Sequence, residues 1–367
     1  MKILWFTWKD KYHPLAGGAE VVNEEVAKRL VKDGHEIIFV VGGFEGGKKF
    51  DNIDGYKVIR VGGRFTCYWH AYRLYKKNLI GWADLIIEEV NTIPFFTNLY
   101  AKEKTHLIIH QLCREIWFYQ MFFPLNLVGY LLEPVYLRLI NKCPTITISE
   151  SSKADILRHG FDKKKISIIS MGITFPISEN IDNIKKFNRF TILSLGAVRE
   201  MKRTIHTLKA FEILRNSGFD SELIIAGNTD GKYGEKFLDL VKKSEYQKDI
   251  KCLGRVSLDQ KIELMQKSHV ITVTSVKEGW GLIVTEANSQ GTPAVVYDVD
   301  ALRDSVQHEK TGLVCKNNAP RCLAENISKL ASDSKKYEYL RKNAWNWSKE
   351  INFDRCYDEF LEALNNK

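Results

Sequence analysis

The sequence predicts an α/β protein of two domains, each an open parallel sheet with helices wound on both faces. Its 367 residues exceed what one hydrophobic core usually serves, which favours two domains. A strand, a loop, an amphipathic helix and a second strand follow one another from the first residue, and the pattern restarts after residue 176. Such sheets bind ligands beyond the carboxyl ends of their strands, so two facing domains predict a cleft with the active site between them.

The first domain is expected over residues 1–176. KILWFTW is its first strand, and the loop KDKYHPLAGGAE leads into a helix that Gly34 ends before the strand HEIIFVVGG. Further strands are predicted at 57–61, 84–88, 106–109 and 144–148. The polar stretch PISENIDNIKKFNRF indicates a linker.

The second domain is expected over residues 187–345. Its predicted strands are FTILSLG, SELIIAG, IKCLG, VITVTSV and PAVVYD, with helices between them. Residues 346–367 have helical spacing, and that spacing fits either a helix packed locally or one that crosses back onto the first domain.

The charge, cysteine content and apolar runs of the chain narrow the range of functions to consider. The net charge of +9 is not gathered in a basic stripe, and no zinc spacing or aromatic RNA-binding motif accompanies it, so a nucleic-acid domain is not expected. An anionic membrane surface or a phosphorylated ligand fits the charge better. The seven scattered cysteines lack a C-x-x-C pair and indicate reduced thiols in a cytoplasmic protein. No signal peptide and no run of 18 apolar residues is found.

Two common nucleotide-binding motifs are missing from this α/β pattern. No G-x-G-x-x-G follows a predicted strand, because GGFEGG at 42–47 has the wrong spacing, and there is no Walker lysine motif. A dinucleotide-dependent dehydrogenase is therefore not favoured.

The stretch KEGWGLIVTEANSQGTP, residues 277–293, carries the clearest chemistry. Its glycines allow close backbone approach to a ligand, and the amides of 279–283 stand at a helix N-terminus, which suits a phosphate. Glu278 precedes this helix and Glu286 lies little more than one turn inside it. Two hydroxyl-binding carboxylates beside a phosphate seat fit a nucleotide-sugar. Spacing alone fits equally a Glu278 that caps the helix and a Glu286 at the surface.

The segment EGWGLIVTEANSQGTPAV resembles the signature of the family 4 retaining glycosyltransferases, which have the GT-B fold of two facing Rossmann-like domains. GGAE at 17–20, SESSKADILRHGF with KKISIISMGI at 149–173, LSLGAVREMKR, YDVDALRDSV and EKTGLV resemble further family segments in the same order. The likeness covers nearly the whole chain. In this family a final helix crosses back onto the first domain, which favours that placement for 346–367.

The resemblance implies transfer of a sugar from a nucleotide donor to an acceptor hydroxyl, with retention and without metal or other cofactor. Lys202 would neutralise the leaving diphosphate, Glu278 would hold sugar hydroxyls and Glu286 the ribose. Backbone amides would bind the sugar and diphosphate at Gly279, Trp280, Gly281 and Leu282, and the loop at Gly17 and Gly18 would close over the diphosphate. The leaving phosphate would take the acceptor proton, so the two glutamates are binders and not a glycosidase pair.

The chain departs from the family where an arginine usually follows the glycine of LSLG, because Ala197 stands there. Arg199 or Arg203 could supply the second cation, and Arg199 is favoured over a solvated helix start. His110 matches the family histidine near the anomeric carbon, where it would bind the sugar, although a lone histidine after a strand is more often structural.

Two acidic patterns remain. Glu88 and Asn91, at another strand end, are candidates for the acceptor side. The DVD of 298–300 matches the D-x-D that holds metal in a different glycosyltransferase fold, but it follows a strand where acidic residues are common, and no metal is expected.

Residues 116–140 are the most apolar stretch, interrupted by Pro124, Glu133, Pro134 and Arg138, and so not a spanning helix. They fit either a buried helix pair or an exposed apolar face that meets a membrane or a lipid-linked acceptor. Nearby basic residues could hold such a face against anionic lipid: Arg114, Arg138, Lys142 and the lysines at 163–165. We expect peripheral contact at the cytoplasmic membrane face.

The sequence therefore predicts a cytoplasmic, metal-independent retaining glycosyltransferase that moves a hexose from a UDP- or GDP-linked donor to a glycan or lipid-linked saccharide. A nucleotide-sugar epimerase on a similar scaffold is the first alternative. The second is a non-catalytic, membrane-associated scaffold, for which Ala197 is the only hint.

Overall fold

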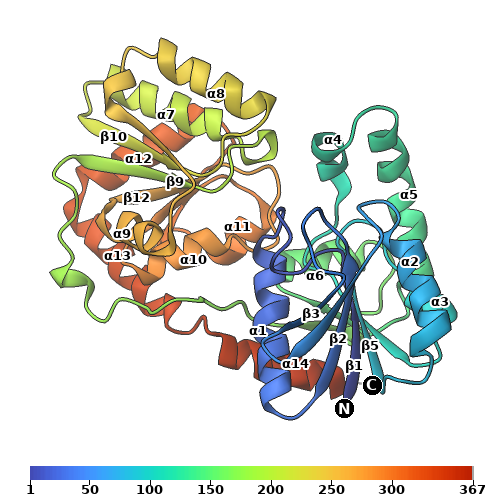
Figure 1. Ribbon diagram of the computed structural model, residues 1–367. Coiled ribbons are helices and arrows are strands. Elements are labelled where there is room, and N and C mark those ends of the chain that lie inside the picture. Colours follow the sequence, from blue (N-terminus) through green and yellow to red (C-terminus); the bar gives the residue numbers. More distant parts are fainter. Residues whose placement is uncertain (366–367) are drawn as a thin grey trace. The chain divides into compact units, whose positions relative to one another are not determined.

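The computed structural model describes residues 1–365, which form two compact units (Figure 1). Unit 1 combines Met1–Gly172 with the C-terminal segment that starts at Asn352, and unit 2 is Ile173–Ile351. Each unit contains one sheet with helices packed around it, so the prediction of two parallel α/β domains is confirmed.

The sheet of unit 1 has the strand order β3-β4-β2-β1-β5-β6-β7-β8. Every neighbouring pair is parallel except β3 and β4, which form an antiparallel hairpin at the edge that the sequence analysis did not foresee. The strands are β1 Lys2–Phe6, β2 Glu36–Gly42, β3 Phe50–Ile53, β4 Tyr56–Val61, β5 Leu85–Glu89, β6 Lys104–Ile108, β7 Thr145–Thr147 and β8 Ile166–Ile168. The strand order reverses between β1 and β5, the point where such sheets bind ligands.

Helices surround this sheet on both faces (Figure 1). They are α1 Gly18–Lys32, α2 Cys67–Leu74 with the π-helical turn η1 Tyr75–Leu79, α3 Thr97–Tyr100, η2 Arg114–Ile116, α4 Trp117–Gln120, α5 Leu125–Ile140, α6 Glu150–Leu157, η3 Lys163–Lys165 and α14 Phe353–Asn365.

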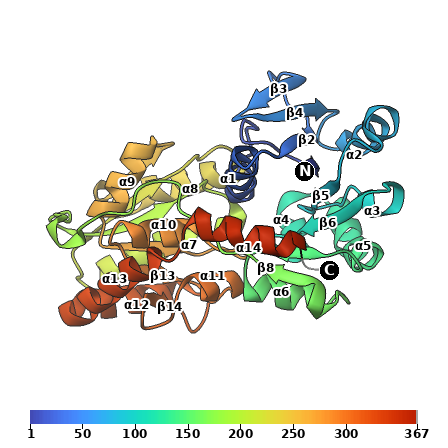
Figure 2. The ribbon, with the colours of Figure 1, turned by 90° about the horizontal axis from the view of Figure 1, so that it is seen from below.

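Helix α14 packs on unit 1, against α1 and β8 (Figure 2). The ring of Phe360 stacks on Trp5 with centroids 5.9 Å apart. The hydroxyl of Tyr357 donates to Asp33 over 2.7 Å, and Glu359 accepts from the backbone of Ser170. The apolar side of this amphipathic helix therefore completes the core of unit 1.

The sheet of unit 2 is parallel throughout, in the order β11-β10-β9-β12-β13-β14. Its strands are β9 Phe190–Leu195, β10 Ser221–Ala226, β11 Ile250–Gly254, β12 Val270–Val273, β13 Ala294–Val296 and β14 Gly312–Val314. Its helices are η4 Ile181–Asn183, η5 Glu200–Lys202, α7 Thr204–Asn216, α8 Lys232–Lys243, η6 Gln247–Asp249, α9 Leu258–Lys267, α10 Leu282–Ser289, α11 Asp300–Ser305, α12 Pro320–Ser332 and α13 Ser334–Ser348. Here the strand order reverses between β9 and β12.

A partly buried lysine attaches the segment that leads into β9 to the rest of unit 2. Nζ of Lys186 lies within 2.9 Å of the carbonyl oxygens of Gln266, Ser268 and Gly291 and of the hydroxyl of Thr292, and it donates hydrogen bonds among these four acceptors. Burial lowers the pKa of Lys186 well below its usual value. The polar stretch expected to be a linker is thus bonded to unit 2.

Within residues 1–365 no helix is both long and apolar enough to cross a bilayer.

Candidate active site

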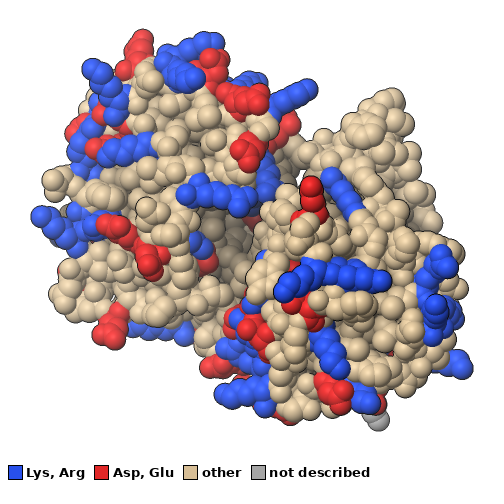
Figure 3. Space-filling view, in the orientation of Figure 1, with Lys and Arg blue, Asp and Glu red and all other residues tan. Residues whose placement is uncertain are grey.

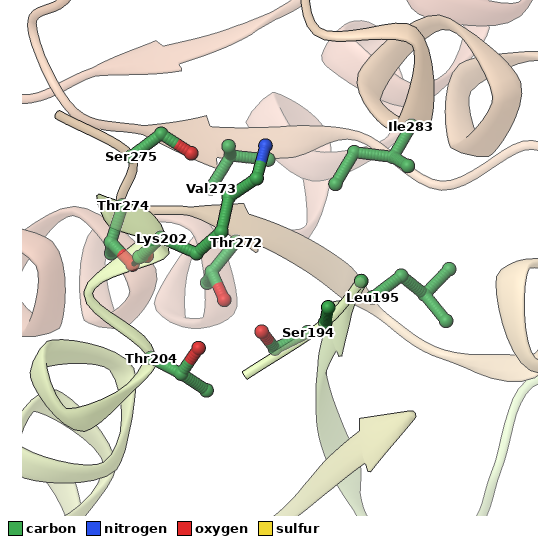
Figure 4. Close-up of a pocket in the computed structure, with 11 residues that line it drawn as sticks. Ser194, Leu195, Lys202, Thr204, Thr272, Val273, Thr274, Ser275 and Ile283 are labelled. Atoms are coloured by element: carbon green, nitrogen blue, oxygen red, sulfur yellow. Dashed lines mark hydrogen bonds between the residues drawn. The ribbon is translucent and has the colours of Figure 1, made fainter. Parts of the chain in front are cut away.

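The carboxyl ends of β9 and β12 in unit 2 border a small hollow that is open to solvent (Figure 4). Its lining residues come from the two strand ends and the turns that follow them: Ser194, Leu195, Gly196, Ala197, Lys202, Thr204, Thr272, Val273, Thr274, Ser275 and Ile283. The hollow lies at the point where the strand order reverses, which is where open parallel sheets commonly bind ligands.

Lys202 enters this hollow from η5 and pairs with Glu278. Its Nζ lies 2.5 Å from Oε1 of Glu278, and the hydroxyl of Ser275 donates to the same oxygen over 2.6 Å. The carbonyl of Lys202 accepts from the hydroxyl of Thr274, which holds η5 against the end of β12. A cation and a carboxylate that the sequence separates are therefore adjacent.

The turn after Glu278 prepares the N-terminus of α10. Gly281 is the residue before the helix and has a φ of +99°, which favours glycine. A Cβ at this position would lie 2.8 Å from the side chain of Leu302 and 3.1 Å from that of Ser305. No side chain caps the helix, so Glu278 is not its cap. The first amides of α10 are left without a side-chain partner, as an anion seat requires.

Glu286 lies on α10 with its carboxylate almost wholly buried. Nζ of Lys261, from α9, lies 2.7 Å from this carboxylate. Burial raises the pKa of Glu286, and the ammonium of Lys261 opposes that rise. Lys261 could not be predicted from the sequence, because 25 positions separate it from Glu286 and no motif marks it.

The cations proposed to replace the family arginine lie outside the hollow. Ala197 lines the hollow, whereas Arg199 and Arg203 do not belong to the lining. Arg199 is exposed at the start of η5, and Arg203 takes a left-handed conformation with a φ of 49°. Lys202 is the basic residue of the lining, and Arg199 as second cation stays a prediction.

The DVD segment is engaged within the protein. The guanidinium of Arg303 pairs with both Asp298 and Asp300. Over the described residues 1–365, no cluster of three or more His, Cys, Asp or Glu side chains is arranged to hold a metal ion.

In unit 1 the carboxyl ends of β1, β5 and β6 bring a second polar cluster together. Glu89, fully buried, accepts from the hydroxyl of Thr7 over 2.5 Å and from the amide of Asn23 over 2.6 Å. Nε2 of His110 lies 3.6 Å from Glu89, and Asn91 donates to the same carboxylate. Burial lowers the pKa of His110 to about 4 and raises the pKa of Glu89. His110 is therefore a neutral imidazole near pH 7.

Glu88 points to the other face of the strand. Its carboxylate accepts from the backbone and hydroxyl of Thr97 and from the backbone of Phe96. Glu88 is fully buried, and these bonds satisfy the start of α3. Glu89, its neighbour, is the acidic residue that lies beside His110, which sequence reasoning did not single out.

The loop before α1 is also ordered by a carboxylate. Glu20 accepts from the amide of Gly17 over 2.6 Å and pairs with Lys9 at 3.0 Å. Gly17 and Gly18 are exposed at this helix start, where a ligand can reach the backbone.

Comparisons with known proteins agree with this arrangement. The family model of glycosyltransferase family 4 matches residues 16–175, and that of glycosyl transferases group 1 matches residues 177–347. An uncharacterised glycosyltransferase of Methanocaldococcus jannaschii is 25% identical, over 94% of this chain and 92% of that protein.

Solved structures share the fold over the whole chain. Sucrose-phosphate synthase from Thermosynechococcus elongatus aligns with a TM-score of 0.79 at 15% identity, over 99% of this chain and 98% of the other. HepE of Anabaena, solved in complex with UDP-glucose, aligns with a TM-score of 0.75 at 17% identity, over 100% of both chains.

Proposed function

The chain belongs to family 4 of the glycosyltransferases and has the GT-B fold, and on that premise we propose that it is a retaining hexosyltransferase. It takes the sugar from a UDP- or GDP-linked donor and passes it to a hydroxyl of a glycan or lipid-linked saccharide. The observation that carries this proposal is a set of three features in unit 2. They are the ion pair of Lys202 with Glu278, the N-terminus of α10, which has no side-chain cap, and the ion pair of Lys261 with Glu286.

Each group has a proposed task on the donor. Lys202 neutralises the diphosphate as it leaves, and the amides at the start of α10 hold its oxygens. Glu278 accepts from sugar hydroxyls. Glu286 accepts from the ribose diol, and Lys261 opposes the rise in the pKa of that carboxylate that its burial causes.

The bond between the anomeric carbon and the diphosphate oxygen breaks while the acceptor oxygen bonds to the same face of that carbon. The acceptor proton passes to the departing phosphate oxygen, so no protein nucleophile is required. No metal or other cofactor takes part in this scheme. We further propose that His110 binds the sugar as a neutral imidazole and that the loop at Gly17 and Gly18 binds the diphosphate. Arg199 is the proposed second cation, and Asn91 a proposed acceptor contact.

A uridine base is favoured for the first tests, because HepE of Anabaena was solved with UDP-glucose. The matched family models describe transferases, and the epimerase alternative finds no support in them. Product analysis separates the two, since an epimerase changes the nucleotide-sugar without any acceptor.

Thermal unfolding against UDP-, GDP- and ADP-sugars without added metal tests the proposal. A ligand bound only by the folded protein raises the midpoint by mass action. Glu286→Ala is expected to lose this shift, whereas Glu325→Ala, an exposed glutamate on α12, is expected to keep it. NMR of the product made from the identified donor then reports whether the anomeric configuration is retained. No shift with any donor would favour the scaffold alternative.

A further inference from the structure

Helices α4 and α5 form a hairpin, residues 117–140, whose solvent side is apolar. Its exposed large apolar side chains are Phe118, Tyr119, Phe122, Phe123, Leu125, Leu127, Val128, Leu131, Leu132, Val135 and Leu139. Single exposed apolar residues are ordinary on soluble proteins, but a gathering of this size on one element marks an interaction surface.

The spacing along α5 shows that these residues form one stripe. Leu125, Val128, Leu132, Val135 and Leu139 follow one another at intervals of three or four, so they share a helix face. Residues of the opposite face are buried in unit 1: Glu133, Tyr136, Leu137 and Ile140. A surface helix normally turns its apolar stripe to the core, whereas α5 contacts the core with one face and exposes leucine and valine on the other.

Hydrogen bonds of Glu133 anchor the hairpin to the segment before it. The buried carboxylate of Glu133 accepts from the backbone of Cys113 over 2.7 Å, from that of Arg114 over 2.6 Å and from the indole of Trp117 over 3.0 Å. Gly129 allows the ring of Trp117 to lie against α5, because a Cβ there would lie 2.4 Å from that ring. The stripe is therefore presented by an anchored element.

The turn between the two helices carries the most exposed rings. Phe122 and Phe123 expose 72% and 75% of their surface. Within unit 1, the hairpin extends beyond the carboxyl ends of the strands (Figure 1), and the space-filling view shows no charged side chain over its projecting end (Figure 3). A projecting apolar tip suits insertion into a lipid surface better than the binding of a small molecule.

The charges around the hairpin are basic. Between residues 117 and 142 the single acidic residue is the buried Glu133, while Arg138 and Lys142 are exposed. The guanidinium of Arg64 reaches the sulfur of Met121 at 3.8 Å. The exposed carboxylate nearest in sequence, Glu115, precedes α4. These cations complement anionic headgroups, whereas a second copy of the chain would bring the same cations against them.

We propose that the α4–α5 hairpin docks the protein on anionic bilayers, with Phe122, Phe123 and the α5 stripe inserted at the boundary between headgroups and acyl chains. The 16 residues of α5 measure about 24 Å, which suits a helix lying in the interface and not one crossing the bilayer. Vesicle binding requires no sugar donor, so this inference stands or falls separately from the proposed transfer reaction.

Co-sedimentation of the full chain with two kinds of vesicle tests the inference: phosphatidylcholine alone, and phosphatidylcholine mixed with phosphatidylglycerol. The wild type is expected to sediment with the mixed vesicles, and less so as salt rises. The double variant Phe122→Ser/Phe123→Ser is expected to lower the partition coefficient at least about tenfold, because two large apolar side chains no longer leave water. Arg138→Gln/Lys142→Gln is expected to reduce the preference for the anionic vesicles.

The matched control is Phe50→Ser/Tyr339→Ser, which removes two exposed aromatic rings from other elements. It is expected to bind as the wild type does. Because all four rings are exposed, each double variant should unfold at the wild-type temperature, which the same thermal assay checks. The inference fails if the wild type binds neither kind of vesicle, or if the Phe122/Phe123 variant and the Phe50/Tyr339 variant bind equally well. It also fails if the wild type dimerises without lipid and the Phe122/Phe123 variant is monomeric, since the occupant would then be a second copy.

Discussion

Lys202 and Glu278 lie 76 positions apart in the chain, yet Nζ of Lys202 is 2.5 Å from Oε1 of Glu278. Ser275 donates to the same oxygen. A diphosphate that binds the ammonium and a sugar that donates to the carboxylate would each compete with this pair. The contact therefore aligns two side chains whose proposed tasks fall on neighbouring parts of one donor.

Lys202→Met is expected to lower kcat/KM by roughly 10²–10³, because the charge that develops on the leaving phosphate loses its cation. Steady-state kinetics with the donor identified by thermal shift measures the effect. Lys236→Met, an exposed lysine on α8, removes the same charge away from the hollow and serves as control. Equal rates for the two variants would exclude a role for Lys202 in stabilising the transition state.

Lys261→Met is expected to raise the KM for the donor with little change in kcat, because it weakens binding of the ribose and not the reacting bond. Without the ammonium, burial raises the pKa of Glu286 further. Since only the ionised carboxylate accepts two hydroxyl bonds, the variant should lose donor affinity at a higher pH than the wild type does as pH falls. Donor titrations across the acidic range check this.

The control for that experiment is Lys267→Met, on the same helix, whose lysine pairs with the exposed Glu263. Its KM should follow the wild-type pH curve. A shift of the same size in both variants would show that the effect comes from net charge and not from Glu286.

Gly281→Ala is expected to destabilise unit 2 and to weaken donor binding. An alanine there pays the conformational cost of a φ of +99° and also meets the side chains of Leu302 and Ser305. Gly231→Ala is a matched comparison, since Gly231 has a φ of +89° but no atom within 4 Å of the added Cβ. Thermal unfolding with and without donor should show a loss of the donor-induced shift in the Gly281 variant alone.

The buried His106 is expected to make unit 1 sensitive to acid. Burial lowers its pKa to about 4, so the unfolded chain takes up the proton first as pH falls. The resulting stability is fully present above about pH 6.5 and is lost progressively as pH falls towards 4. His106→Leu keeps an apolar group in the core and should flatten that decline. Parallel curves for variant and wild type between pH 7 and 4.5 would contradict the assignment.

Much of the fold follows from local sequence pattern. The alternation of apolar strands with amphipathic helices depends on neighbouring residues, so it indicates the parallel sheets without knowledge of their packing. The pattern predicted β4, but it missed the antiparallel partner β3, which has only four residues before the turn at Asp54 and Gly55.

The candidate site was only partly predictable. Glu278, Gly281 and Glu286 lie in one segment, where spacing around a helix start is informative. Lys261 and Glu89 contact residues that lie far away in the sequence. Only the packing of α9 against α10, and of β5 between β1 and β6, brings these residues together.

The sequence by itself determined the class of sheet, the glycine-flanked helix start and the family resemblance, because each depends on contiguous residues. The tertiary structure decided which charges meet and which apolar residues stay exposed. The leucines of α5 recur at the same helical spacing whether they face a core or the solvent. Which face is covered depends on what the rest of the chain packs against it, and no local pattern contains that information.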